Sequence, residues 1–154
     1  MISCVLAACA GGSYASGDRP VGVANRGETN GRRFDFVSNK PEQDDWQIRV
    51  TGSSMWVSYA RDEQSDKLGS INLTDAETIK LWDLIDGLDI PNRKTGAKDE
   101  DEGWVSVQLK EPGDDDSGVH FVYISRASKD KHLISLATYL QDLTEKYKKE
   151  RPNF

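Results

Sequence analysis

Cysteine is almost absent from this chain of 154 residues. Both cysteines, Cys4 and Cys9, lie within the first ten residues, and none follows. A disulfide framework is therefore excluded for the remainder of the chain, and so is a thiolate metal site. The folded part must hold together by the packing of apolar side chains.

Histidine is just as scarce, with only His120 and His132 in the chain. The two do not form the His-Glu-x-x-His pattern of zinc enzymes, and no Gly-x-Ser-x-Gly turn presents a nucleophilic serine. We interpret both histidines as surface or structural residues. We therefore expect a protein that is not an enzyme and that carries no cofactor and no metal.

The chain also lacks a long hydrophobic run and an excess of basic residues. No stretch approaches the roughly 18 consecutive apolar residues that would span a bilayer. The formal charge is −6, and because a phosphate backbone selects for basic patches, we do not expect nucleic acid as a partner. The acidic runs Asp99–Glu102 and Asp114–Asp116 lack the spaced ligands of a calcium loop, and we interpret them as solvated loops.

The first residues do contain a short apolar stretch that ends at a cysteine. Secretory signals have a positively charged start, then an apolar stretch, then small residues. Here no Lys or Arg precedes the apolar stretch. The sequence Leu6-Ala7-Ala8-Cys9 resembles the lipobox of bacterial lipoproteins. That resemblance implies that residues 1–8 are the remnant of a signal peptide and that Cys9 carries the lipid.

The same resemblance implies a location at the bacterial cell envelope. In lipoproteins of Gram-negative bacteria, an Asp after the lipidated cysteine favours the inner membrane. Ala10 stands there, which implies the outer membrane, facing the periplasm or the cell surface. Residues 9–33 contain six Gly and few large apolar groups, which predicts a flexible tether between the membrane and a domain at 34–154. The alternatives for residues 1–9 are a buried apolar strand or the start of a fragment of a longer protein.

Beyond the tether, alternation of apolar and polar residues predicts about five strands. A possible further strand at Phe34–Val37 is expected at the edge of the sheet. The other strands are expected at Trp46–Thr51, Met55–Tyr59, Leu68–Leu73, Trp104–Lys110 and Val119–Ser125.

Two segments change to a helical period. Thr74-Asp75-Ala76-Glu77 is a capping box that predicts the start of a helix, and Gly87 is expected to end it in a left-handed conformation. A second helix is expected from about Lys129 to Glu150, with one apolar stripe. The order hairpin-helix-hairpin-helix predicts an α+β fold, with an antiparallel sheet, two helices on one face and the other face partly open.

This layout is similar to that of the emfourin-type inhibitors of thermolysin-like metalloproteases. Both have the hairpin-helix-hairpin-helix order and a Leu-rich helix before an aliphatic-Pro step, here Asp89-Ile90-Pro91. The resemblance covers Trp46 to Leu143 and implies an inhibitor-like role. It assigns no individual residue, because no inhibitory motif matches.

The tryptophans supply the candidate binding residues, Trp46, Trp56 and Trp104. An open sheet face that carries Trp would be a binding surface, because Trp is enriched at interface hot spots. Alternatively, residues 34–37 or the tether cover these side chains. The leading hypothesis is a lipid-anchored, non-catalytic binding module with the membrane and an envelope protein as partners. The alternatives are a hydrolase with two carboxylates across a cleft, or a purely structural envelope component.

Overall fold

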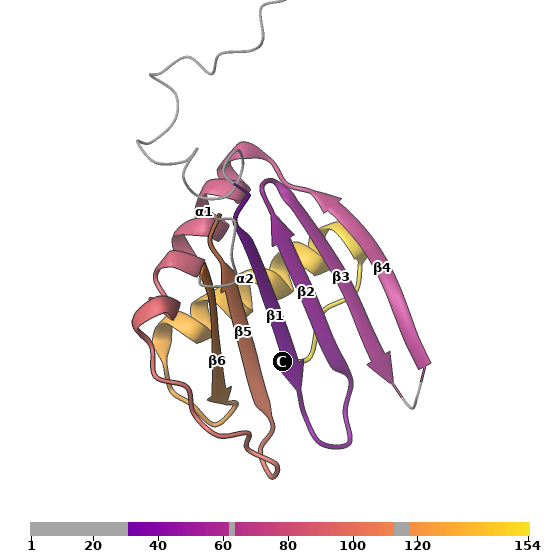
Figure 1. The fold of residues 1–154 in the computed structure, drawn as a ribbon. Coiled ribbons are helices and arrows are strands. Elements are labelled where there is room, and N and C mark those ends of the chain that lie inside the picture. The colour runs from indigo at the N-terminus through magenta and orange to yellow at the C-terminus, as the bar shows by residue number, and fades with distance from the viewer. Residues whose placement is uncertain (1–30, 62–63, 113–117) are drawn as a thin grey trace, which may run out of the picture.

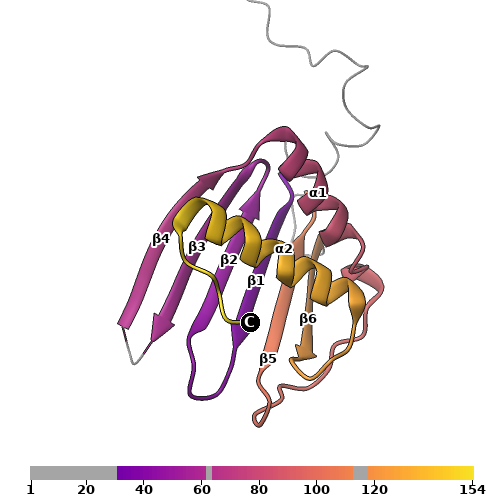
Figure 2. The same ribbon diagram turned by 180° about the vertical axis from the view of Figure 1, so that it is seen from behind.

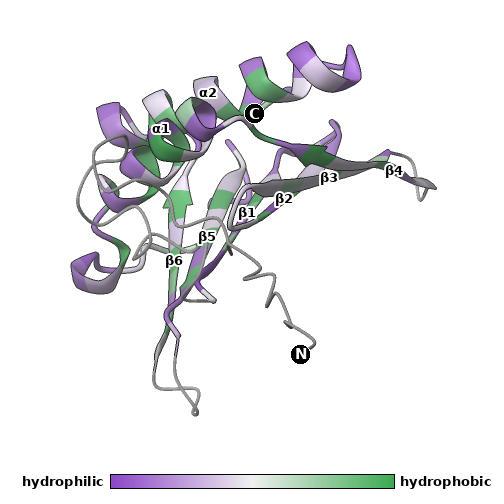
Figure 3. Ribbon diagram, turned by 90° about the horizontal axis from the view of Figure 1, so that it is seen from above, coloured by the Kyte–Doolittle hydropathy of each residue, from purple (hydrophilic) through white to green (hydrophobic). Residues whose placement is uncertain are grey.

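The structure is a computed structural model that describes residues 31–61, 64–112 and 118–154. These residues form one antiparallel sheet with two helices on one of its faces (Figures 1 and 3). The α+β class predicted from the sequence is therefore confirmed. The predicted lipidation site Cys9 lies outside the described residues, as do most of the tether and the acidic run Asp114–Asp116.

The sheet has six strands, one more than the number expected, in the order β4-β3-β2-β1-β5-β6. All neighbouring strands are antiparallel, and the first four form a continuous meander. The strands are β1 (Arg33–Asn39), β2 (Asp45–Thr51), β3 (Ser54–Arg61), β4 (Gln64–Asn72), β5 (Trp104–Lys110) and β6 (Val119–Ser125).

The prediction of an edge strand at Phe34–Val37 is wrong. These residues belong to β1, which lies at the centre of the sheet between β2 and β5. Phe34 and Phe36 are fully buried, which is what a central strand under two helices requires. The chain returns to pair β5 with β1 only after it has formed the first helix, so this pairing joins residues about 70 positions apart.

Helix α1 (Asp75–Asp86) begins at the predicted capping box. The Thr74 hydroxyl accepts a hydrogen bond from the Glu77 amide, and the Glu77 carboxylate accepts one from the Thr74 amide at 2.9 Å. The predicted left-handed stop at Gly87 is wrong, because Gly87 has a right-handed φ of −63°. Asp89 takes the left-handed conformation instead, with φ 51°, immediately before a 3-10 turn.

Helix α2 (Lys131–Lys148) crosses the same face of the sheet at an angle (Figure 2). Its predicted apolar stripe is confirmed, since Leu133, Leu136, Leu140 and Leu143 are buried against the sheet and α1. In the part of the chain that the structure describes, no helix is long and apolar enough to cross a membrane.

Arg32 belongs to the folded domain, although it precedes Phe34, where the sequence predicts the domain to begin. Its side chain is only 8% exposed and lies over the Trp82 ring, with 5.1 Å between the guanidinium carbon and the ring centroid. The guanidinium forms ion pairs with Asp86 of α1 at 2.7 Å and with Glu111 after β5 at 3.0 Å. The chain is therefore joined to the rest of the domain before β1 begins.

Candidate functional site

The face of the sheet that the helices leave uncovered, here called the outer face, carries a cluster of aromatic side chains on β5 and β6. The strand register places Trp104, Phe121 and Tyr123 on this face. The Tyr123 ring lies 5.4 Å from the Trp104 ring and 4.6 Å from the Phe121 ring, edge to face in both pairs. Such pairs each contribute about 0.5–1.5 kcal/mol beyond the area that they bury. We call these three residues the aromatic patch.

The loop before β5 fixes a lysine over the aromatic patch. Gly96 of this loop donates its amide to the Tyr123 carbonyl at 2.8 Å, and the Thr95 hydroxyl accepts the Tyr123 amide at 2.9 Å. The Lys98 ammonium lies 5.0 Å from the Trp104 ring centroid and 5.3 Å from that of Tyr123. A cation at this distance is attracted to the ring faces by about 0.5–1 kcal/mol at an exposed site. The geometry of the patch therefore already accommodates one positive charge.

Four consecutive acidic residues follow Lys98 and form an acidic rim, Asp99–Glu102. Asp99 accepts hydrogen bonds from the Ser125 hydroxyl at 2.5 Å and from two backbone amides of its own turn, and these bonds lower its pKa. Glu100, Asp101 and Glu102 are exposed, and their side chains make no hydrogen bond or ion pair with any residue described. Three unpaired negative charges therefore border the aromatic patch.

Two of the three candidate tryptophans lie on the outer face, but the structure does not bring them together. Trp104 is part of the aromatic patch. Trp56 is half-buried on β3, opposite Arg49 of β2 and Ser70 of β4. Because β3 and β5 are three strand positions apart and the register aligns Trp56 with Gln108, the two tryptophans lie more than about 14 Å apart.

The expectation that Trp46 forms part of a binding surface is wrong. Its side chain is 2% exposed and faces the helices, because it shares the inward side of β2 with Ile48 and Val50. Its ring packs against Tyr59 at 4.8 Å and near Phe154 at 6.4 Å. Its indole N–H has no hydrogen-bond partner among the described residues. Trp46 is a core residue.

Sequence reasoning did not single out three members of this site, Phe121, Tyr123 and Lys98. The alternation in β6 was visible, but alternation alone does not tell which of two faces is open. Phe121 is 44% exposed, which marks it as the outer side of its strand. The Lys98 contact depends on the path of a loop, for which the sequence contains no periodic signal.

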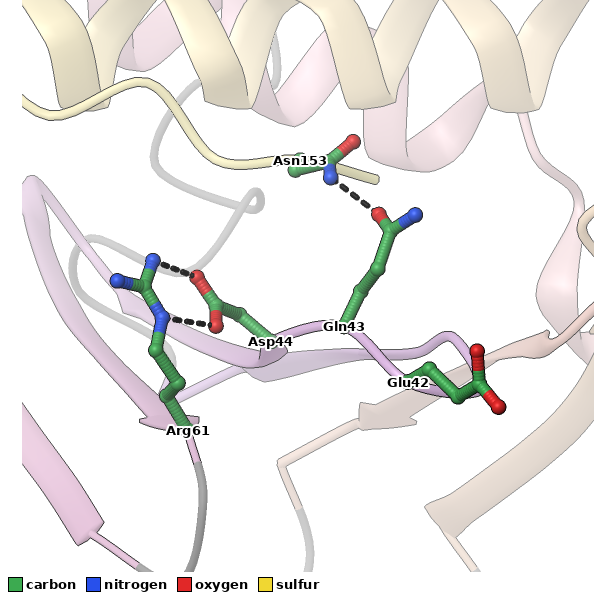
Figure 4. Close-up of a pocket in the computed structure, with 5 residues that line it drawn as sticks. All are labelled: Glu42, Gln43, Asp44, Arg61 and Asn153. Atoms are coloured by element: carbon green, nitrogen blue, oxygen red, sulfur yellow. Dashed lines mark hydrogen bonds and ion pairs between the residues drawn. The ribbon is translucent and has the colours of Figure 1, made fainter.

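A second candidate is a polar pocket of about 550 Å³ at the loop between β1 and β2 (Figure 4). Arg61 donates two hydrogen bonds to the Asp44 carboxylate, at 2.5 and 2.6 Å, and these bonds lower the pKa of Asp44. Burial raises the pKa of the neighbouring Asp45, which accepts a hydrogen bond from Asn39 at 2.7 Å. Asp45 does not line the pocket, however. Two carboxylates, Glu42 and Asp44, do line the pocket, but Asp44 is bound by Arg61 and its pKa is lowered, whereas the acid of a two-carboxylate hydrolase needs a raised pKa.

Comparisons with known proteins give no further guide. A scan against models of protein families finds no match for the chain, and a search of curated proteins finds none either. Among the described residues, no group of three or more His, Cys, Asp or Glu side chains is placed to hold a metal ion. The geometry of the outer face is therefore the main indication of function.

Proposed function

We propose that the protein is a non-catalytic binding module of the bacterial envelope that docks a partner protein through its aromatic patch. The observation that carries this proposal is the patch itself, in which Phe121 is 44% exposed and packs on Tyr123, while the acidic rim follows Lys98 and precedes Trp104. The partner has a surface that presents Lys or Arg side chains among apolar ones. An inhibitor-like role toward a protease is one form that this docking takes.

The chemistry of the patch favours a cationic partner. Lys98 already lies over the rings of Trp104 and Tyr123, so an incoming Arg, the cation most often found over such rings, exchanges with Lys98 there. Large aromatic residues are also the commonest energetic anchors of protein interfaces. The acidic rim adds long-range attraction for basic groups, which raises the rate of association more than the final affinity. The aromatic patch and the rim therefore select for the same partner.

The N-terminal segment supports the second part of the proposal, which is the anchor. Leu6-Ala7-Ala8-Cys9 has the residue order of a lipobox, and a Gly-rich segment follows it. Acyl chains on Cys9 would bind the membrane with about 0.8 kcal/mol per buried methylene group. The proposed location is the outer membrane, with the domain facing the periplasm or the cell surface.

The anchor is tested by expression of the full chain in a Gram-negative host, followed by membrane fractionation and intact mass. We expect a membrane-bound form that starts at Cys9 and carries the added mass of acyl chains. Cys9→Ser should remain soluble, and Cys4→Ser, the matched control, should behave like the unmodified chain. A soluble protein that retains Met1 would refute the anchor and leave the docking proposal standing.

The docking surface is tested by a photo-crosslinking amino acid placed at position 121 or, as a control, at position 72. Asn72 is exposed on the same face, but on β4, at the opposite edge of the sheet. We expect a discrete protein adduct from position 121 only. Neutralising the rim with Glu100→Gln, Asp101→Asn and Glu102→Gln should lower the yield roughly fivefold, as should about 0.5 M salt. The absence of an adduct would favour the structural alternative. An adduct whose yield is unchanged by the three rim substitutions would refute a basic partner.

A further inference from the structure

A groove of about 210 Å³ lies on the helix-covered side of the sheet, opposite the aromatic patch. It is bounded by the first half of α2, by β1 and β5, and by the C-terminal tail, which runs back over the sheet beside α2 (Figure 2). Phe36, Val105, Leu133, Ala137 and Phe154 make most of its wall apolar. The apolar wall alone gives no indication of what the groove would hold, but one charged side chain does.

Arg126 reaches this groove from the turn after β6 and is held in place from two sides. Its guanidinium donates a hydrogen bond to the hydroxyl of Ser38, a fully buried residue on the inner face of β1. Its Cδ passes so close to Gly103 that a Cβ there would come within 2.8 Å of it. Because Gly103 has no side chain, Arg126 can cross the start of β5. The position of the cation is therefore fixed before any ligand arrives.

Arg126 forms no ion pair with any residue described. Asp130, the nearest acidic residue along the chain, bonds instead to Arg93 and caps α2 by accepting the His132 amide at 2.8 Å. Burial of the Arg126 guanidinium lowers its pKa. Arg32 makes the contrast clear, because that buried arginine has two carboxylate partners. A desolvated cation without an anion is unfavourable unless something else supplies the negative charge.

We propose that this groove binds a small anionic amphiphile, with a carboxylate on Arg126 and an apolar chain along Phe36, Val105 and Ala137. A guanidinium presents parallel N–H groups that match the two oxygens of a carboxylate. The volume lies below the roughly 300–1,000 Å³ of sites for drug-sized ligands, so the apolar chain is short. Ile134, which lines the groove and is 51% exposed, offers further apolar surface that such a chain would cover.

The probe for the test is octanoate, titrated into the full chain and followed by amide NMR shifts and calorimetry. We expect saturable binding, with shifts concentrated at Val105, Arg126 and Ala137. Arg126→Gln should weaken octanoate binding at least about tenfold, since a charged hydrogen-bonded pair is lost. Arg49→Gln should leave the affinity unchanged, because Arg49 pairs with Asp35 on the outer face of the sheet, away from the groove.

A second test uses only the unmodified protein, so its result does not depend on whether a variant folds. Octan-1-ol has the same chain length but no charge, and it should bind more weakly than octanoate to the unmodified protein. Equal affinity for the two probes would overturn the role of Arg126, and shifts confined to the outer face would overturn the site. A dimer that octanoate does not dissociate would show that a second copy occupies the groove. Since the aromatic patch lies on the opposite face, failure here leaves the docking proposal untouched.

Discussion

Glu77 joins the two helices through a single carboxylate, and its charge should contribute measurably to stability. The carboxylate accepts hydrogen bonds from the Thr74 amide at 2.9 Å, the Lys146 ammonium at 2.6 Å and the Tyr147 hydroxyl at 2.8 Å. The first bond closes the start of α1, and the other two come from the last turns of α2. Burial raises the pKa of Glu77, but these hydrogen bonds outweigh it and lower the pKa to about 2 from the usual 4.5.

The pKa gives an upper bound to the contribution of this charge. A fall from 4.5 to about 2, at about 1.4 kcal/mol for each unit, corresponds to roughly 3 kcal/mol at neutral pH. The Glu77 side chain is 13% exposed, but that of Lys146 is 59% exposed, so water screens part of the attraction. We therefore expect Glu77→Gln to lower the free energy of unfolding by about 1–2 kcal/mol. Gln still serves as the acceptor of a capping box, so the substitution removes mainly the charge.

The pH dependence follows from the direction of this change. Because the pKa of Glu77 is lower in the folded protein than in the unfolded chain, its contribution is fully present above about pH 4.5. The contribution is lost as the pH falls through the interval between 4.5 and about 2. The unmodified protein and the Glu77→Gln variant should therefore differ most at neutral pH and converge toward the acid end of this interval.

Urea unfolding over a series of pH values measures this difference directly. Glu100→Gln is the matched control, because Glu100 is exposed in a loop and its side chain has no bond to a described residue. That control should match the unmodified protein throughout. If Glu77→Gln lost no stability at neutral pH, or if its deficit stayed constant down to about pH 2, the Glu77 charge would not be a source of stability.

Three further predictions concern stability, each measured by chemical unfolding. Trp46→Ala should lower the free energy of unfolding by about 3–5 kcal/mol. Trp46→Phe should lower it by less than about 2 kcal/mol, because Phe keeps most of the ring contacts and removes an unpartnered N–H. Equal losses for the two variants would contradict the packing described. Gly103→Ala should lower the free energy of unfolding by roughly 3–4 kcal/mol, because the new Cβ would lie 2.5 Å from a carbonyl oxygen. Gly31→Ala should lower it by only about 1–2 kcal/mol, because Gly31 has a similarly positive φ but nothing within 4 Å of the new Cβ. Arg32→Ala should cost about 2 kcal/mol and Arg33→Ala, whose side chain is 38% exposed, less than about 1; the reverse order would place the start of the domain after Arg32.

The features that sequence reasoning predicted correctly are those fixed by neighbours in the chain. The capping box joins Thr74 to Glu77, three residues apart, and the stripe of α2 depends only on a 3.6-residue period. Local interactions of this kind can be predicted from the sequence because the interacting residues are only a few positions apart in the chain.

The features that it missed depend on pairing between distant segments. No residue near Phe34 predicts that β5 pairs with β1. A short strand at the start of the domain was therefore expected to be an edge strand. The direction of Trp46 was open for the same reason, since alternation separates two faces without saying which one the helices cover. Arg126 and Ser38 meet across 88 positions of sequence, and only the folded sheet brings them together.

Both proposed sites lie on the faces of the sheet, and the two sheet edges show why. The loop that carries Lys98 pairs with the outer edge of β6 through Thr95 and Gly96, so a partner strand cannot add there without displacing it. The opposite edge, β4, carries Asp66 and Lys67, and its ladder with β3 contains a bulge between Val57 and Ser58. Charge and irregular pairing both discourage the addition of another strand. A binding partner must therefore recognise side chains on the faces of the sheet and not the backbone of a sheet edge. The aromatic patch offers such side chains on the outer face, and the Arg126 groove offers them on the face that the helices cover.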